Sequence, residues 1–367
     1  MTINVTKPYL PPFDEYVELM KVVWDSKQLT NNANYSRILE NNLCEYLDVP
    51  NVTLFSSGTT ALIAAIKCLD LKGEVITTPF SFIATTSSLL WNNIKPVFVD
   101  IEERTLNLDP FKVVDVINEN TSGVLPVHCY GNPANVDEYL NIKERFDLNI
   151  IYDGAHSFGT ECSCSSLLSH GDLSAVSFHA TKVFNTFEGG AVISHTAEHK
   201  MKLEQLRNFG FSGTADSLIV NQGFNGKLNE MQAALGLLQL KYIAEVLKSR
   251  KAIADLYLKN ISNITGIKPM INIDTYKSNY AYFPIIIEDS YPLDRDALHC
   301  KFKENGINVR KYFYPLIPSM PIIGWSEDKI RDLLPIAYDI SSRIICLPIY
   351  PGLELDNQNK IISILHH

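Results

Sequence analysis

The chain has no long apolar run, no excess of positive charge and no secretion signal. None of its 367 residues belongs to an apolar stretch of about 18 residues, the length needed to cross a membrane. The segment MTINVTKPYLPP lacks the charged-then-apolar pattern of a signal peptide. The formal net charge is −9 and no basic cluster stands out, which disfavours nucleic-acid binding. We therefore expect no membrane insertion, no nucleic-acid partner and a cytoplasmic location.

Other absences exclude common classes of site. The seven cysteines are dispersed and odd in number, so they form no disulfide framework, and reduced thiols suit a cytoplasmic protein. The Cys162–Cys164 pair is too tight and too isolated for zinc, and we expect no metal. No GxxxxGK[ST] or GxGxxG motif follows any predicted strand, which removes the main support for nucleotide triphosphate or dinucleotide binding.

An acid and a lysine instead follow two apolar runs. Asp153 ends NIIYD, and Lys182 lies in SFHATKVFNTFEGG, shortly after a second strand-like run. This combination suits pyridoxal phosphate (PLP): a lysine amine bonds to the cofactor aldehyde, and a carboxylate keeps the pyridine nitrogen protonated. Taken alone, each residue is more often a solvated charge or a helix cap.

A small-residue turn gives the pair a possible phosphate site. The apolar run VTLFS is followed by Ser57, Gly58, Thr59 and Thr60, which open an Ala- and Leu-rich helical stretch. Free N–H groups at a helix start favour a phosphate dianion. An ordinary Ser/Thr helix cap explains the same residues.

Seven motifs in order resemble the DegT/StrS-type sugar aminotransferases. They are SSGTTAL, TPFSFIATT, PVFVDI, LPVHCYGNP, YDGAHSFG, SFHATKVFNTFEGG and FNGKLNEMQAALGLLQL. The resemblance runs from about residue 6 to the C-terminus. It implies an aspartate-aminotransferase-like α/β fold (fold type I) with a mainly parallel seven-stranded sheet flanked by helices, and a small C-terminal α+β domain. It also implies PLP, L-glutamate as donor (leaving as 2-oxoglutarate), and a homodimer with shared active sites.

The resemblance also implies a role for each matching residue. Lys182 bonds to the cofactor and moves the proton, Asp153 meets the pyridine nitrogen, and His156 lies near the ring oxygen. Gly58, Thr59 and Ser177 match phosphate-binding positions, Phe82 matches an aromatic that stacks on the cofactor, and Asn225 matches a residue reaching the phosphate from the neighbouring subunit. Without the resemblance, Phe82 is equally explained as core, His156 as a structural hydrogen-bonding residue and Asn225 as a turn residue.

The substrate implied by the NTFEGG and YDGAHSFG forms is a dTDP-4-keto-6-deoxyhexose, aminated at C4 for O-antigen or another surface polysaccharide. Three alternatives stay open at this point: a C3-specific nucleotide-sugar aminotransferase, a PLP enzyme of another reaction class, and a non-catalytic ligand-sensing regulator on the same fold. Two departures from the family pattern matter. Ala33 replaces a common glycine beside Asn31 and Asn32, and Lys227 replaces a common arginine.

Periodicity predicts an α/β arrangement with two domains. The predicted strands are 52–56, 74–78, 95–100, 123–128, 149–153, 173–179 and 190–194, and the predicted helices are 59–69, 81–91, 110–118, 136–145 and 197–207, followed by a long helix from about Leu228. Residues 26–258 would form the PLP-binding domain, with 1–25 and 259–367 in the small domain. There we predict a strand at 280–287, a helix ended by Gly306 and a further strand leading to YFYPL. Arg310, Tyr312 and Tyr314 are candidates for the substrate mouth, although core packing explains the tyrosines equally well.

Overall fold

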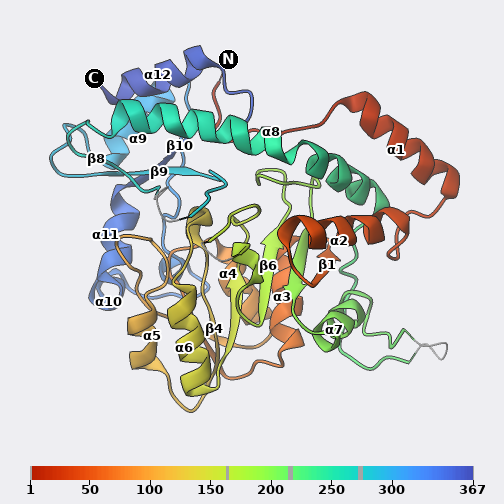
Figure 1. The fold of residues 1–367 in the computed structure, drawn as a ribbon. Helices are drawn as coiled ribbons and strands as arrows, with labels where there is room; N and C mark the ends of the chain where they lie inside the picture. Colours follow the sequence, from red (N-terminus) through yellow and green to blue (C-terminus); the bar gives the residue numbers. More distant parts are fainter. Residues whose placement is uncertain (1, 163–164, 214–217, 272–275, 367) are drawn as a thin grey trace.

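A seven-stranded sheet forms the centre of the larger part of the molecule (Figure 1). The structure is a computed structural model that describes residues 2–162, 165–213, 218–271 and 276–366. The strand order is β1-β7-β6-β5-β4-β2-β3, and within the described strands of this sheet β7 runs opposite to the other six. The strands are β1 (Asn51–Phe55), β2 (Glu74–Thr77), β3 (Lys95–Phe98), β4 (Thr121–Leu125), β5 (Asn149–Asp153), β6 (Leu173–Ser177) and β7 (Gly190–Ser194). All seven coincide with predicted strands to within a few residues.

Helices cover both faces of this sheet because neighbouring residues of a strand point to opposite faces. On β5, for example, Ile151 packs with helices α3, α4 and α7, whereas Ile150 packs with α5 and α6 on the other side. The helix α2 and the first half of α8 complete the second face. Their bounds are α2 (Asn34–Leu47), α3 (Gly58–Cys68), α4 (Ile83–Trp91), α5 (Pro110–Val116), α6 (Val136–Phe146) and α7 (Ala197–Arg207). The predicted α/β class is confirmed.

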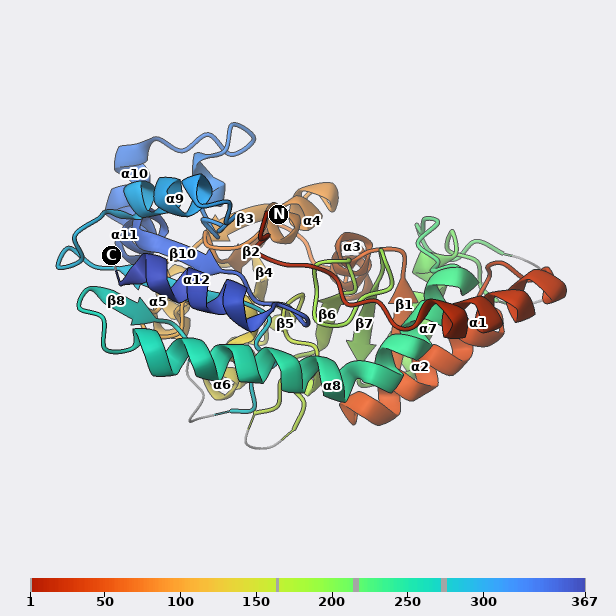
Figure 2. The same cartoon turned by 90° about the horizontal axis from the view of Figure 1, so that it is seen from above.

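The helix α8 (Glu230–Ile261) is the longest described element and runs along both parts of the molecule (Figure 2). It begins two residues after the predicted Leu228, because the Asn229 side chain accepts a hydrogen bond from the Gln232 N–H (2.9 Å) and caps the helix. Its first half packs against α2 and against α1 (Phe13–Ser26), and its second half against the C-terminal elements. This helix therefore links the two halves of the fold.

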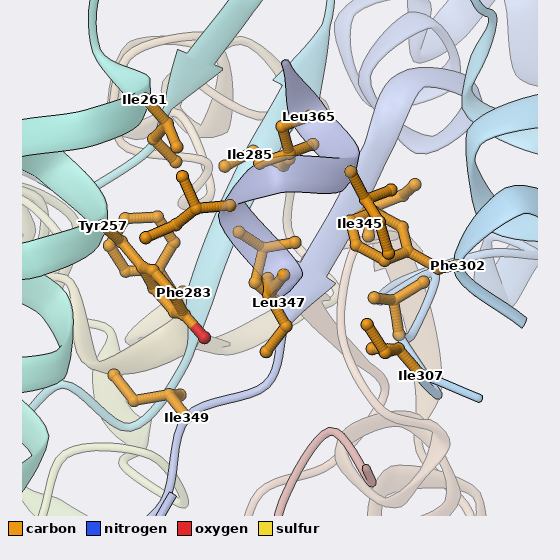
Figure 3. Close-up of a cluster of buried hydrophobic side chains, with 14 of the residues drawn as sticks. Tyr257, Ile261, Phe283, Ile285, Phe302, Ile307, Ile345, Leu347, Ile349 and Leu365 are labelled. Carbon is orange, nitrogen blue, oxygen red and sulfur yellow. The ribbon is translucent and has the colours of Figure 1, made fainter. Parts of the chain in front are cut away.

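A second, three-stranded antiparallel sheet organises the C-terminal part. Tyr257 and Ile261 of α8 pack against Phe283 of β9, Leu347 of β10 and Leu365 of α12 (Figure 3). These apolar contacts hold the small sheet against α8. The elements are β8 (Ile267–Pro269), β9 (Phe283–Ile287), α9 (Arg295–Glu304), α10 (Glu327–Leu333), α11 (Pro335–Arg343), β10 (Ile344–Leu347) and α12 (Leu355–Leu365).

Two predictions for this part need correction. The strand predicted at 280–287 begins only at Phe283, because Tyr280 has a left-handed φ of 51° and the Asn279 side chain accepts the Ala281 N–H, which keeps the segment in a turn. The strand predicted before YFYPL is wrong. Among the described residues this segment makes single bridges only, between Ile3 and Ile307 and between Arg310 and Cys346.

The N-terminal segment contacts both parts of the molecule. Ile3 bridges to Ile307 of the C-terminal part, whereas α1 packs beside the first half of α8. The predicted domain boundaries therefore stay a proposal. No helix within the described ranges combines the length and apolar character needed to span a membrane.

Candidate active site

A cavity of about 390 Å³ lies where strands β5 and β6 end. Its walls come from both parts of the fold, because side chains from the large sheet and α3 face side chains from the segments before β9 and after α9. All but one of the predicted catalytic and cofactor-binding residues line it: Gly58, Thr59, Phe82, Asp153, His156, Ser177 and Lys182. Open α/β sheets place their ligands in this position.

Asp153 is the last residue of β5 and is buried, with 4% of its surface exposed. One carboxylate oxygen accepts a hydrogen bond from the Thr85 hydroxyl (2.7 Å), and the other accepts the Ala155 N–H (3.1 Å). The Thr85 hydroxyl is itself 2.8 Å from that of Ser81. Burial raises the pKa of Asp153, while Thr85, Ala155 and the nearby Lys182 act in the opposite direction. A cationic partner in the cavity would favour its ionised form.

Lys182 lies in the loop between β6 and β7 and faces the same cavity. Its N–H donates to the His179 carbonyl in a turn (2.9 Å), and its amine lies 5.9 Å from the ring centroid of Tyr282. Burial lowers the pKa of Lys182 to about 8, and Asp153 opposes this shift. The amine is therefore neutral, and nucleophilic, at a much lower pH than an exposed lysine.

His156 is held in one tautomer by the backbone. Its Nδ1 accepts the Tyr130 N–H (3.2 Å), and its ring lies parallel to that of Phe313, with centroids 6.1 Å apart. Burial lowers the pKa of His156 well below its usual range, so the ring is neutral. A neutral imidazole that accepts at Nδ1 carries its proton on Nε2. His156 can therefore donate one hydrogen bond to an anionic oxygen.

The turn before α3 is shaped for an anion. Ser57 and Thr60 form a capping box, in which the Thr60 N–H donates a hydrogen bond to the Ser57 hydroxyl (3.1 Å). Gly58 and Thr59 precede it in the first helical turn, where N–H groups have no partner within the helix. A Cβ atom on Gly58 would lie 2.8 Å from the Cβ of Ser177. The glycine thus lets the helix start approach β6.

We predict that Gly58→Ala weakens cofactor binding about 10- to 100-fold, because the added methyl group must push Ser177 or the helix start aside. Titrating the apoprotein with PLP measures the dissociation constant. The control is Gly352→Ala, at a glycine whose added Cβ would meet no atom within 4 Å and which does not line the cavity, so this variant should keep the wild-type affinity for PLP. A single variant with wild-type affinity and an unshifted helix would contradict the close approach.

Phe82 and Asn225 differ most from their simplest interpretations. Phe82 lines the cavity and is 60% exposed, so its interpretation as a core residue is wrong. Asn225 is exposed, bridges to Asn208 and does not line the cavity of its own chain. Lys227 lies beside it, and its amine donates to the Asn208 side chain (3.1 Å).

The glycine-to-alanine departure in the N-terminal loop is harmless to the backbone. Ala33 is the extended N-cap of α2, with φ −73°, whereas Asn31 and Asn32 take the left-handed angles (φ 63° and 55°). Asparagine tolerates this region better than most residues. The loop geometry therefore does not need a glycine at position 33.

Several cavity residues were not predicted. Tyr282 and Phe313 reach the cavity from the C-terminal part, and in the loop that carries Lys182 the Nε2 of His179 lies 3.5 Å from a carboxylate oxygen of Glu188. Arg310 and Tyr312, predicted for the mouth, do line the cavity, but Tyr314 does not. Within the described ranges, no group of three or more His, Cys, Asp or Glu side chains could hold a metal ion, and Cys164 lies outside those ranges.

The residues present fit PLP. A helix start that a Cβ would obstruct suits the phosphate, the buried Asp153 suits the pyridine nitrogen, and Lys182 supplies the amine. Residues 14–366 match the model of the DegT/DnrJ/EryC1/StrS aminotransferase family. The chain belongs to this family. It is a PLP-dependent aminotransferase of fold type I, and the predicted family, enzyme class and cofactor are confirmed.

Two relatives are similar over almost their entire length. The dTDP-4-amino-4,6-dideoxy-D-glucose transaminase of Shigella dysenteriae is 44% identical over 361 residues, covering 98% of this chain and 97% of the relative. The enzyme of the same name from Escherichia coli is 42% identical over 371 residues, covering 99% and 98%. No other substrate is named for either relative.

Solved structures show the same architecture. The structure of DesI in the presence of its TDP-sugar product has a TM-score of 0.92 at 27% identity and covers 99% of this chain and 92% of that one. Helicobacter pylori PseC, an aminotransferase involved in pseudoaminic acid biosynthesis, has a TM-score of 0.91 at 27% identity and covers 100% and 98%.

Proposed function

We propose that the enzyme transfers the amino group of L-glutamate to the C4 keto group of dTDP-4-keto-6-deoxy-D-glucose. The products are 2-oxoglutarate and dTDP-4-amino-4,6-dideoxy-D-glucose, a sugar suited to O-antigen or another surface polysaccharide. The near full-length identity of 44% and 42% to transaminases named for this product carries the proposal. No observation favours C3 amination, another reaction class or a non-catalytic regulator.

In the proposed mechanism, PLP supplies an aldehyde that accepts the amino group and a ring that draws electrons from the reacting carbon. Gly58, Thr59 and Ser177 would hold the phosphate at the start of α3. The neutral His156 would donate from Nε2 to the ring oxygen, and Phe82 would pack on the ring. These residues would hold the cofactor in the cavity.

Two further residues carry the chemistry. Asp153, whose carboxylate accepts hydrogen bonds from Thr85 and Ala155, would keep a proton on the pyridine nitrogen. With PLP present, the Lys182 amine would hold its aldehyde carbon, and once the amine of the donor has replaced it, the freed Lys182 amine would take the proton from the α-carbon of the donor. In the second half-reaction the same amine would deliver a proton to C4 of the sugar. The face of C4 that receives the proton sets the configuration of the product.

An isotope experiment tests this function. Incubating the PLP-loaded enzyme with ¹⁵N-labelled L-glutamate and dTDP-4-keto-6-deoxyglucose should give a nucleotide sugar with ¹⁵N bonded to C4, detected by NMR. Label at C3 of a 3-keto sugar, with none at C4 under these conditions, would contradict the proposal.

The lowered pKa of Lys182 leads to a pH prediction. Because only the neutral amine attacks the aldehyde, covalent labelling of Lys182 by PLP with borohydride trapping should rise with pH, reach half of its maximum near pH 8 and then level off. An exposed lysine should continue to gain reactivity toward its ordinary pKa of about 10.4. Peptide mass spectrometry distinguishes labelling at Lys182 from labelling at exposed lysines. Labelling at Lys182 that still rises above about pH 10 would contradict the buried environment.

We also propose that the enzyme is a homodimer in which Asn225 completes the phosphate site of the neighbouring subunit. Asn225 is exposed and does not line the cavity of its own chain, and exposed apolar side chains lie on the same segment: Phe209, Leu218, Ile219 and Val220. Exposed apolar patches of this kind are typical of interfaces.

Subunit mixing tests the shared site. Lys182→Ala and Asn225→Ala homodimers should each have weak activity. After the two are mixed and allowed to exchange subunits, activity should rise, because a mixed dimer has one site free of both changes. A mixture no more active than the average of its parents, with exchange verified by mass, would place Asn225 outside the partner's site.

A further inference from the structure

The start of helix α4 supplies two hydroxyl groups close to Asp153. Phe82 is the N-cap of this helix, Ser81 lies one residue earlier and lines the cavity, and Thr85 lies in the first helical turn. Thr85 is completely buried, with 0% of its surface exposed, and Ser81 has 4% exposed. Hydroxyl groups this deeply buried are stabilised by fixed partners, because solvent does not reach them.

The two hydroxyl groups form a chain of hydrogen bonds with one direction. Thr85 donates its single hydroxyl proton to one carboxylate oxygen of Asp153, at 2.7 Å. The Ser81 hydroxyl lies 2.8 Å from that of Thr85. Because Thr85 has already given its proton to Asp153, Ser81 is the donor in this second bond. Each donor in such a chain polarises the next, which strengthens the bond that reaches the carboxylate.

The chain favours the ionised form of Asp153. A charged oxygen accepts a hydrogen bond more strongly than a neutral one, so protonation of Asp153 would weaken the bond from Thr85. The same holds for the other oxygen, which accepts the Ala155 N–H at 3.1 Å. Burial acts in the opposite direction and favours the neutral carboxyl group. The ionised form therefore depends on the donors around it.

Other titratable groups near Asp153 come from three segments. Lys182, in the loop after β6, lowers the pKa of Asp153. Burial raises the pKa of Cys129 well above its usual value and lowers that of His156 well below, so both side chains are neutral. A Lys182 amine bonded to the cofactor supplies no free ammonium group. The hydrogen bonds from Thr85 and Ala155 are then the main support that the chain gives to the ionised carboxylate.

We propose that Thr85, with Ser81 behind it, is a positioning residue that keeps Asp153 ionised and so keeps the proton on the cofactor's ring nitrogen. The proposal rests on the role proposed above for Asp153. The carboxylate and the ring nitrogen would share one proton, which stays on the stronger base. The hydrogen bond from Thr85 makes the carboxylate the weaker base. Without this bond, the proton moves from nitrogen to oxygen and the ring draws electrons less strongly.

The test uses the enzyme loaded with PLP that carries ¹⁵N at the ring nitrogen, without donor or sugar. The ¹⁵N chemical shift, recorded against pH, reports whether this nitrogen is protonated. We expect half-protonation to fall about one to two pH units lower in Thr85→Val than in wild type. Thr85→Ser keeps the hydroxyl and should restore the wild-type profile. Ser81→Ala removes only the outer hydroxyl and should give a smaller change. The kcat of Thr85→Val should fall about 10-fold or more, with little change in either KM.

Thr86→Val is the matched control. Thr86 is the next residue of α4 and is equally buried, and its hydroxyl has no hydrogen-bond partner within the part of the chain that the structure describes. Loss of that hydroxyl should leave the ¹⁵N profile unchanged. A Thr85→Val profile equal to that of wild type, with the ring protonated in both, would overturn the proposal, as would an equal change in Thr86→Val.

The same spectra separate this proposal from those on which it rests. A wild-type ring nitrogen without a proton would contradict the role of Asp153 itself. Because neither donor nor sugar is present, a wrong sugar substrate would leave the ¹⁵N profiles unaffected and would appear only in the assay of the product.

Discussion

Replacing Lys182 with alanine is expected to lower turnover by about 10⁴-fold or more, because one change removes both the nucleophile and the group that moves the proton. The phosphate turn and Asp153 are untouched by this change, so the variant should still bind PLP. It should bind without the covalent link, which borohydride trapping and mass spectrometry detect. Steady-state production of the amino sugar is the main measurement.

The matched control for this variant is Lys95→Ala. Lys95 is 72% exposed and pairs with Glu74 at the opposite end of strands β2 and β3 from the cavity, so its loss should leave turnover unchanged. If Lys182→Ala kept turnover within about tenfold of wild type, another group would have to move the proton and the assignment would be wrong.

Changing Asp153 to asparagine is expected to lower kcat by about 10²- to 10³-fold, the effect of removing one partner from a buried charge pair. The amide keeps the size of the carboxylate but carries no charge to hold a proton on the pyridine nitrogen. Its NH₂ group also faces a donor, because both carboxylate oxygens accept hydrogen bonds from Thr85 and Ala155. The half-reaction with glutamate alone should slow by a similar factor.

Asp172→Asn is the control for Asp153→Asn, because it removes the charge of another aspartate that lies close to a strand of the same sheet. Asp172 pairs with Lys143 and accepts the Ile150 N–H (2.8 Å), but it does not line the cavity. We expect a loss of stability without a comparable loss of kcat. Equal kcat values for Asp153→Asn and wild type, with PLP fully bound, would show that the buried carboxylate has no role in the chemistry.

The sequence predicted the large sheet well because its signals are local. Short apolar runs bounded by turns gave all seven strands, and Ser57 with Thr60 marked the start of α3 through ordinary capping chemistry. The antiparallel direction of β7 was not predicted, since strand direction depends on chain crossings rather than on residue pattern. The strand expected before YFYPL failed because an alternating pattern also fits an irregular segment with single bridges.

The sequence predicted those site residues that are charged or that belong to a recognisable motif. Asp153 and Lys182 stand out as charges near strand ends, and the structure places both at one cavity. Thr85 gave no such signal, because a neutral hydroxyl in an apolar helix is common, yet it fixes the orientation of Asp153. Tyr282 and Phe313 were missed because they arrive from the C-terminal part through long-range packing, which no local pattern reports.

The central claim is tested most directly by the absorbance of the purified protein with PLP, recorded before and after two additions. The account predicts a band from the cofactor bound to Lys182, its loss on adding L-glutamate, and its return on adding dTDP-4-keto-6-deoxyglucose. Loss without return would contradict the proposed sugar substrate. A protein that takes up PLP but shows neither the band nor any response to glutamate would contradict the assignment of Lys182 and the mechanism built on it.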